Sequence, residues 1–259
     1  MPVTIKTPQE IEKMRESNRR LEIVHDELAK MIRPGISTLD INREGERLIR
    51  ELGGVPSFLH YNGYPASICV SVNDEVVHGI PKADRILREG DIVSLDAGMI
   101  WEGYHSDAAR THAVGKVSDK AARLIRDTEE CFFRGMEFAR AGHYLYEISA
   151  AIGDYAEGLG YGVVRDLTGH GIGKSMHEDP VIPNYRQKRS GIRLVEGMTL
   201  AVEPMITTGT WKVRWLDDDW TVVTADHSLA AHYENTILIT DGDPEILSLT
   251  KGRRHPEAG

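Results

Sequence analysis

Five side chains with metal-binding oxygen or nitrogen atoms occur in short segments that resemble strands or tight turns. They are Asp96, Asp107, His170, Glu203 and Glu234, in the segments DIVSLDAG, GYHSDAART, TGHGIG, LAVEPM and HYENTILI. Four carboxylates and one imidazole suit two divalent cations of moderate hardness, because carboxylates can bridge a pair of ions. Two metals about 3.5–4 Å apart are a standard means of activating water against an amide or an ester. The set therefore indicates a hydrolase.

The spacing of the first two of these residues predicts that they share one face of a hairpin. We expect strands over 92–96 and 107–114, with turn residues 102–104 between them. A hairpin centred between positions 101 and 102 places Asp96 directly opposite Asp107, with Cβ atoms about 5 Å apart. A β-bulge near the turn would change this register. In the alternative interpretation, Asp107 caps a turn and Asp96 ends a strand.

The other three residues are weaker signals when each is taken alone. His170 lies between glycines, which allow other groups to approach its ring closely, but a lone histidine in a loop is more often a packing residue. Glu203 follows an apolar run and precedes Pro204, and a buried carboxylate must be paired or bound to metal. Glu234 precedes a strand over 235–239 and could equally be a charge at a strand edge. The joint occurrence of the five carries the hypothesis.

In order and context, these segments closely resemble those of the methionine aminopeptidases, specifically the short type I form. The resemblance extends over about residues 7–241 and is most specific in YPASICVSVNDEVVHGIP, DAGMIWEGYHSD, TGHGIGKSMHEDPVIPNY, EGMTLAVEPM and HYENTILI. It implies that Asp96 holds one metal, that His170 and Glu203 serve the second, and that Asp107 and Glu234 bridge the two. The donor set fits Co, Mn, Fe or Zn.

The same resemblance implies a reaction and the residues that perform it. The reaction is removal of the N-terminal methionine from nascent proteins and peptides with a small second residue, by attack of metal-activated water on the first peptide bond. His78 and His177 would hydrogen-bond the scissile amide and stabilise the developing oxyanion. Glu203 would relay a proton from the water to the leaving nitrogen. Without the surrounding motif, each histidine would be interpreted as a satisfied loop residue.

Recognition of methionine calls for an apolar and partly aromatic pocket, because the thioether side chain is long, unbranched and polarizable. By the resemblance, the candidate pocket residues are Tyr61, Tyr64, Cys69 and Trp220, with Phe58 and Met176 as further walls. Packing in an ordinary core is the competing explanation for each aromatic residue.

Two alternative functions stay open beside this one. A binding module that has lost its metals would have replaced ligand residues, whereas all five are present here. An X-Pro aminopeptidase or prolidase-like enzyme would use the same metals with another specificity. Only 30 residues separate Glu203 from Glu234. This favours the type I form, because the type II enzymes insert a helical subdomain between these two ligands.

Composition agrees with one enzyme domain over 1–259. The chain has 259 residues and a net charge of −9 at pH 7, without a basic block long enough for a nucleic-acid footprint. The two cysteines, Cys69 and Cys131, give no disulfide framework. No run of about 18 apolar residues is available for a membrane span. We therefore expect a cytoplasmic monomer without specific nucleic-acid binding and without a membrane partner. Nascent polypeptide N-termini and transient association with the ribosome are the partners that the resemblance implies.

Two pairs of helices must position these segments. A capping box at Thr7 and Glu10 predicts a helix to about Met31, and a second helix starts at Ser37 or Thr38 and ends near 53–54. A third helix starts at Ser118, and a fourth runs to about 159–160 after an interruption at 141–142. The segments PGISTLDI and AGHYLYEI align, which indicates a weak internal repeat with halves of about 7–114 and 115–241. This repeat fits the pita-bread fold of the family, an α+β fold with a curved antiparallel sheet and helix pairs behind it.

Overall fold

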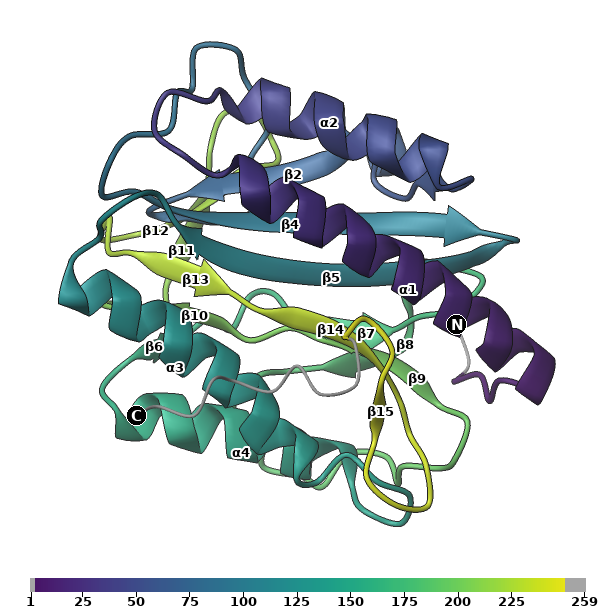
Figure 1. Ribbon diagram of the computed structural model, residues 1–259. Coiled ribbons are helices and arrows are strands. Elements are labelled where there is room, and N and C mark those ends of the chain that lie inside the picture. The colour runs from purple at the N-terminus through teal and green to yellow at the C-terminus, as the bar shows by residue number, and fades with distance from the viewer. Residues whose placement is uncertain (1–2, 250–259) are drawn as a thin grey trace.

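Four helices cover one face of a large antiparallel sheet in the computed structural model, which describes residues 3–249 (Figure 1). The helices are α1 (Pro8–Met31), α2 (Thr38–Glu51), α3 (Asp119–Met136) and α4 (Leu145–Gly158). They form two pairs, α1 with α2 and α3 with α4. No helix within residues 3–249 has the length and apolar character needed to cross a membrane.

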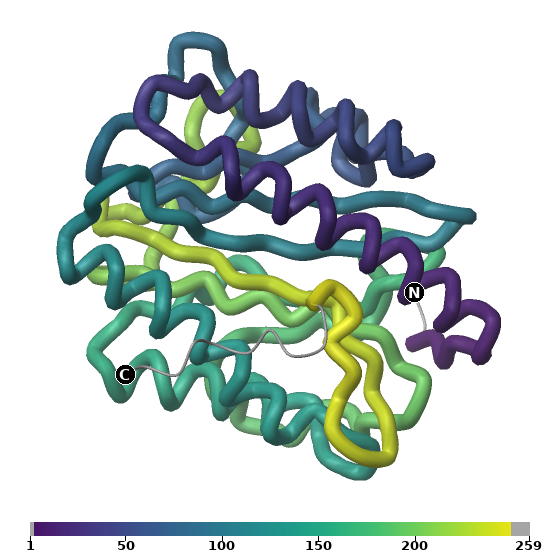
Figure 2. Tube along the Cα trace, in the orientation of Figure 1, coloured from purple at the N-terminus to yellow at the C-terminus, as the bar shows by residue number. Residues whose placement is uncertain are grey.

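The main sheet has nine strands in the order β1-β4-β5-β14-β9-β7-β8, with β2 beside β4 and β15 beside β14. Their bounds are β1 (Val55–Pro56), β2 (Ile68–Val72), β4 (Ile92–Trp101), β5 (Tyr104–Ala113), β7 (Gly169–Gly171), β8 (Glu178–Ile182), β9 (Thr199–Val202), β14 (Glu234–Leu238) and β15 (Glu245–Ile246). Strand β14 lies between β5 and β9, so the end of the described chain joins the two halves of the sheet (Figure 2).

Two small three-stranded sheets complete the α+β fold, and a short 3₁₀ helix spans Tyr61–Gly63. One small sheet has the order β13-β10-β6 and the other β11-β12-β3. Their bounds are β3 (Glu75–Val77), β6 (Gly162–Val163), β10 (Met205–Thr207), β11 (Val213–Trp215), β12 (Val222–Thr224) and β13 (Ala230–His232). In the main sheet, the order β2-β4-β5 meets the order β14-β9-β7 at the β5–β14 pair. This is the arrangement that an internal repeat would produce, although the repeat itself stays a prediction.

The helix ends agree with the capping signals in the sequence. Thr7 accepts a hydrogen bond from the backbone N–H of Glu10, whose side chain accepts one from the backbone of Thr7, so the predicted capping box is present. The side chains of Ser37 and Ser118 cap α2 and α3 by accepting hydrogen bonds from the backbone N–H groups of Asp40 and Ala121. These side chains satisfy N–H groups that have no partner within the helix. The prediction of four helices is confirmed, and so are the three predicted starts at Thr7, Ser37 and Ser118.

The cores lie between the helices and the sheet. One cluster, under α3 and α4, includes Phe132 and Ile148, and a second, under α1 and α2, includes Leu21, Ile49 and Leu95. Side chains along a strand point alternately to its two faces. The strand residues that alternate with this core therefore point to the sheet's other face, where a site can form.

The register of the β4–β5 hairpin differs from the prediction. Trp101 pairs with Tyr104, so residues 102–103 alone form the turn, and Asp107 pairs with Gly98 instead of Asp96. Both turn residues have positive φ angles, 45° and 81°, as a type I′ turn requires. The prediction that Asp96 lies directly opposite Asp107 is therefore wrong, because the strand register is shifted by two residues. Because side chains alternate with a period of two, this shift keeps Asp96 and Asp107 on one face as diagonal neighbours.

Candidate metal centre and substrate pocket

The five predicted metal ligands come from five neighbouring strands of the main sheet. Asp96 lies on β4, Asp107 on β5, Glu234 on β14 and His170 on β7, while Glu203 directly follows β9. The sheet order β4-β5-β14-β9-β7 is therefore the order of the ligands. His170 belongs to a short strand and not to the loop that its glycine neighbours suggested.

The donor atoms are close enough to share metal ions. Nε2 of His170 lies 3.8 Å from Oδ2 of Asp107 and 3.7 Å from Oε1 of Glu203. One donor atom each from Asp107, His170 and Glu234 lie within 4.8 Å of one another. Such separations suit a common ion with bonds of about 2.0–2.2 Å. Nδ1 of His170 is 2.9 Å from the carbonyl oxygen of Gly171, and donation there leaves the Nε2 lone pair for a metal.

The charges of this cluster call for a cation. Burial raises the pKa of Asp96 to about 7 and that of Glu203 to about 8. Burial and the neighbouring carboxylates raise the pKa values of Asp107 and Glu234 well above their usual range. One oxygen each of Asp96, Asp107 and Glu234 is buried without a hydrogen-bond partner within residues 3–249. Buried ionised carboxylates are stable only when paired or bound to metal, so the residues fit divalent ions.

The predicted catalytic histidines adjoin this cluster. The ring centroids of His177 and His170 are 4.3 Å apart, and Nδ1 of His177 is 2.8 Å from the hydroxyl oxygen of Tyr61. The ring of His78 lies edge-on to Trp220 at 6.3 Å. Burial lowers the pKa of His78 to about 4 and also lowers the pKa of His177. Both rings are therefore neutral near pH 7, each with one N–H to donate.

The structure brings all thirteen predicted site residues together. A pocket of about 260 Å³ is lined by Phe58, Tyr61, Asn62, Tyr64, Cys69, His78, Asp96, Asp107, His170, Met176, His177, Glu203, Trp220 and Glu234. Asn62 alone in this set was not predicted. It follows Tyr61 in the short 3₁₀ helix, where polar and turn-forming residues gave no sign of a role.

The apolar wall of the pocket is a cluster distinct from the two cores under the helices. Phe58, Tyr64, Cys69 and Met176 are its buried members, and Trp220 packs against it. The rings of Tyr64 and Trp220 meet edge-on at 5.1 Å, and the Tyr64 hydroxyl donates to the carbonyl of Gly79. Burial raises the pKa of the Cys69 thiol, which is therefore neutral. The aromatic residues thus line the pocket and do not belong to the core under the helices.

Sequence reasoning missed two residues that touch the metal cluster. The amide of Asn184 donates to the backbone carbonyl of Glu203 at 2.9 Å. Nε2 of His232 lies 3.6 Å from Oε2 of Glu203 and 3.9 Å from Oε2 of Glu234. The available signal was the pattern His-x-Glu at the entry to a strand, since alternation places His232 and Glu234 on one face.

Buried carboxylates and a histidine that an antiparallel sheet presents to one pocket are the ligand set of a metal-dependent hydrolase. Residues 12–241 match metallopeptidase family M24, and the chain belongs to this family. It is 52% identical over 247 residues to the methionine aminopeptidase of Clostridium acetobutylicum, and this match covers 95% of this chain and 99% of that protein. The crystal structure of the methionine aminopeptidase from Thermotoga maritima superposes with a TM-score of 0.93, at 42% identity, covering 95% of this chain and 99% of that one.

More distant structures share the fold with lower similarity. The Xaa-Pro dipeptidase from Bacillus anthracis matches with a TM-score of 0.77 at 29% identity, and the match covers 94% of this chain but only 61% of that one. The predicted pita-bread fold is therefore confirmed, and so are the metal-dependent hydrolase class and the resemblance to methionine aminopeptidases. The prolidase-like alternative is not favoured, because the methionine aminopeptidases are the more similar proteins.

Proposed function

We propose that this protein removes the N-terminal methionine from nascent proteins and peptides whose second residue is small. The observation that carries the proposal is one pocket in which the metal-binding cluster adjoins an apolar aromatic wall. An unbranched, polarizable thioether suits such a wall, where sulfur can contact aromatic ring edges. The similarity to proteins named methionine aminopeptidases supports the same activity.

In this proposal, Asp96, Asp107, His170, Glu203 and Glu234 hold two divalent ions. When bound, these ions supply a water of lowered pKa and polarise the scissile carbonyl. Glu203 accepts a proton from the water and delivers it to the leaving nitrogen.

His78 and His177 act on the scissile peptide group. A neutral imidazole donates one hydrogen bond, and a donor that is fixed before reaction stabilises the oxyanion without reorganisation. The phenol of Tyr61, 2.8 Å from Nδ1 of His177, fixes the orientation of that ring. The methionine side chain lies in the chamber formed by Phe58, Tyr64, Cys69, Met176 and Trp220.

Release of methionine from the peptides Met-Ala-Ser and Met-Leu-Ser tests the function. Protein stripped of metal is assayed alone and after Mn or Co is restored. Metal-dependent cleavage of the first peptide but not the second is expected. If folded protein cleaves neither peptide with any metal, the result would favour the metal-depleted binding module. Cleavage of Ala-Pro peptides instead would indicate prolidase-like specificity.

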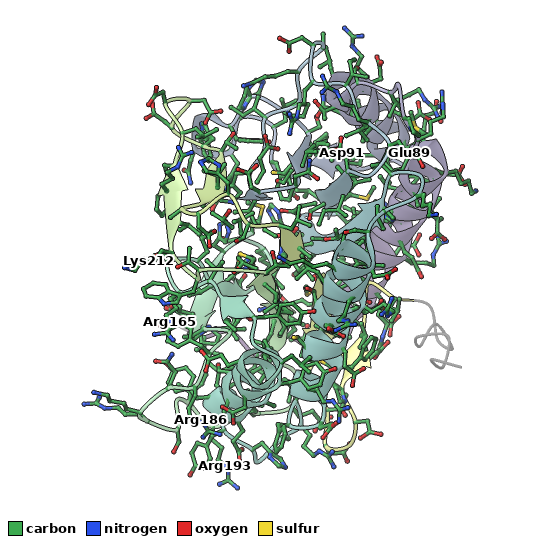
Figure 3. The ribbon with its side chains drawn as sticks, turned by 90° about the vertical axis from the view of Figure 1, so that its left-hand side faces the viewer. Glu89, Asp91, Arg165, Arg186, Arg193 and Lys212 are labelled. Atoms are coloured by element: carbon green, nitrogen blue, oxygen red, sulfur yellow. The ribbon has the colours of Figure 1, made fainter. Side chains whose placement is uncertain are left out.

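The ribosome in the cytoplasm is the partner that this substrate implies, and a basic face suits contact with its RNA. Figure 3 shows Arg186 and Arg193 at one end of the molecule and Arg165 and Lys212 further up one side, whereas Glu89 and Asp91 lie toward the other end. Exposed Lys188 and Arg189 border the same end, in a pocket that Arg165, Arg186 and Glu157 also line. Arg165 pairs with Glu157 and Arg186 with Asp154, so Lys188 and Arg189 supply the excess positive charge of this pocket. The guanidinium of Arg165 stacks on Tyr185 and Trp211, at 5.2 and 4.8 Å.

Charge reversal tests this contact. Lys188→Glu with Arg189→Glu should weaken co-sedimentation with ribosomes and reduce the salt dependence by about one unit of slope per lost phosphate contact. Lys30→Glu with Arg33→Glu, an exposed pair at the end of α1, is the matched control and should bind normally. Equal loss in both variants would show that only net charge matters and would contradict a specific basic face.

A further inference from the structure

His232 is a buried residue beside the metal cluster, and it is not one of the five candidate ligands. It lies on β13 and is 1% exposed. Its backbone is held on both sides, because it pairs with Met205 on β10 and exchanges hydrogen bonds of 3.0 and 2.8 Å with the hydroxyl of Thr111 on β5. The backbone that carries the imidazole is therefore held in place. Alternation of side chains along the strand directs the imidazole to the same face as Glu234.

Two imidazoles lie on opposite oxygens of the Glu203 carboxylate. Nε2 of His170 is 3.7 Å from Oε1, and Nε2 of His232 is 3.6 Å from Oε2. Oε2 of Glu234 is 3.9 Å from the same Nε2 of His232. The side chain of His232 thus faces two carboxylate oxygens, and Glu203 lies between the two rings.

The other ring nitrogens distinguish the roles of these two histidines. Nδ1 of His170 has an acceptor, the carbonyl oxygen of Gly171, so its Nε2 is free to bind a metal. Both ring nitrogens of His232 are buried without a hydrogen-bond partner within residues 3–249, and of the two it is Nε2 that faces carboxylate oxygens, at 3.6 and 3.9 Å. A neutral imidazole carries one proton, and that proton is most stable where acceptors face it. In His232 this position is Nε2, toward the carboxylates of Glu203 and Glu234.

We propose that His232 is a positioning residue for Glu203, toward whose Oε2 it directs an Nε2–H group from 3.6 Å. Its contact keeps Oε1 on the side of His170, where the metal would bind, and keeps Oε2 available for proton transfer. Without it, the carboxylate is free to turn and to offer both oxygens to the metal. The inference deepens the proposed function and rests on it for the role of Glu203.

The proton on Nε2 is directly observable by nuclear magnetic resonance. In protein with ¹⁵N-labelled histidines, the signals of His232 are assigned by their absence in His232→Gln. We expect a one-bond coupling between Nε2 and a proton in the metal-stripped and in the zinc-loaded protein. A zinc-bound Nε2 cannot carry a proton, so loss of this coupling on loading would identify His232 as a ligand and overturn the proposal.

Kinetics of three variants separate positioning from packing. His232→Leu removes the donor at similar volume and should lower kcat at least about tenfold with little change in KM, as loss of a ligand-orienting contact does. His232→Gln keeps an N–H at a similar distance from the backbone and should retain most of kcat. His112→Leu is the control, because His112 alternates with Asp107 on β5 and faces the helices. Its kcat should be unchanged.

These results keep the proposal and the proposed function distinguishable. Equal losses of kcat in His232→Leu and His232→Gln, or normal kcat in His232→Leu, would contradict a positioning role. If His232→Leu does not fold, the Nε2–proton coupling in the unsubstituted protein and the kcat of His232→Gln still test the positioning role. If Nε2 carries a proton but the protein releases no methionine with any metal, the contact between His232 and Glu203 is supported and the proposed function is contradicted.

Discussion

Glu203 carries two tasks, since it is proposed to bind metal and to move a proton. Replacement by glutamine keeps its shape but removes the proton acceptor, so kcat should fall about 10²–10⁴-fold. The fold should persist, because the amide matches the carboxyl group in shape and leaves the backbone contact to Asn184 intact. Methionine release and thermal unfolding check this, with the exposed Glu196→Gln as control. Normal activity in Glu203→Gln would contradict the proposed proton transfer.

The raised pKa values of Asp96 and Glu203 predict a pH dependence of the metal-free protein. Their folded pKa values are about 7 and about 8, against usual values of 3.8 and 4.5. Buried histidines, with pKa values lowered from 6.5, favour folding as pH rises, but this effect ends near pH 6.5. Between pH 6.5 and 8 the folded state therefore binds more protons than the unfolded state, and the free energy of unfolding should fall.

Urea unfolding of chelator-treated protein at several pH values measures this slope. In Glu203→Gln the decline should be shallower, because one of the two titrating groups is gone. Restored metal should reverse the trend, since metal binds the ionised carboxylates and its affinity rises with pH. A free energy of unfolding that rises between pH 6.5 and 8 without metal would contradict the raised pKa values.

At the scale of elements, the close packing of α2 on β2 depends on Gly45. A Cβ atom at this position would lie 2.5 Å from Cγ1 of Ile68 and 2.7 Å from its Cδ1. Gly45→Ala should therefore destabilise the protein by about 1–3 kcal/mol through overpacking, less the gain in helix propensity. Gly158→Ala, at the end of α4 with nothing within 4 Å, is the control and should be neutral or stabilising. Urea unfolding compares the two, and a neutral Gly45→Ala would contradict this packing.

The helices were predictable because their start signals are local. Thr7, Ser37 and Ser118 each cap an N–H within three residues, so no distant contact is needed to recognise them. The hairpin register was not predictable in the same way. It depends on whether Glu102 and Gly103 adopt positive φ angles, and Glu102 is not a residue type that favours them.

At the scale of the whole molecule, bound metal should stabilise the fold, because its candidate ligands come from both halves of the main sheet. A ligand at 100 times its Kd adds about 2.7 kcal/mol to the free energy of unfolding. For a chain of this size, this corresponds to a rise in Tm of about 5–10 °C. Calorimetry before and after chelation measures the shift, and Asp96→Ala should show less of it. An unchanged Tm on chelation would contradict metal binding to the folded state.

The sequence by itself determined the helix starts and predicted the candidate donor and pocket residues, because residue identity and local capping do not depend on distant segments. Their resemblance to the methionine aminopeptidases was also legible in the sequence, since it lies in short continuous motifs. Only the tertiary structure decided the diagonal placement of Asp96 and Asp107, the position of His232 against Glu203, and the contact of Arg165 with Tyr185 and Trp211. Each of these depends on how strands or loops are paired in space, and a pairing is a property of two segments that neither segment encodes alone.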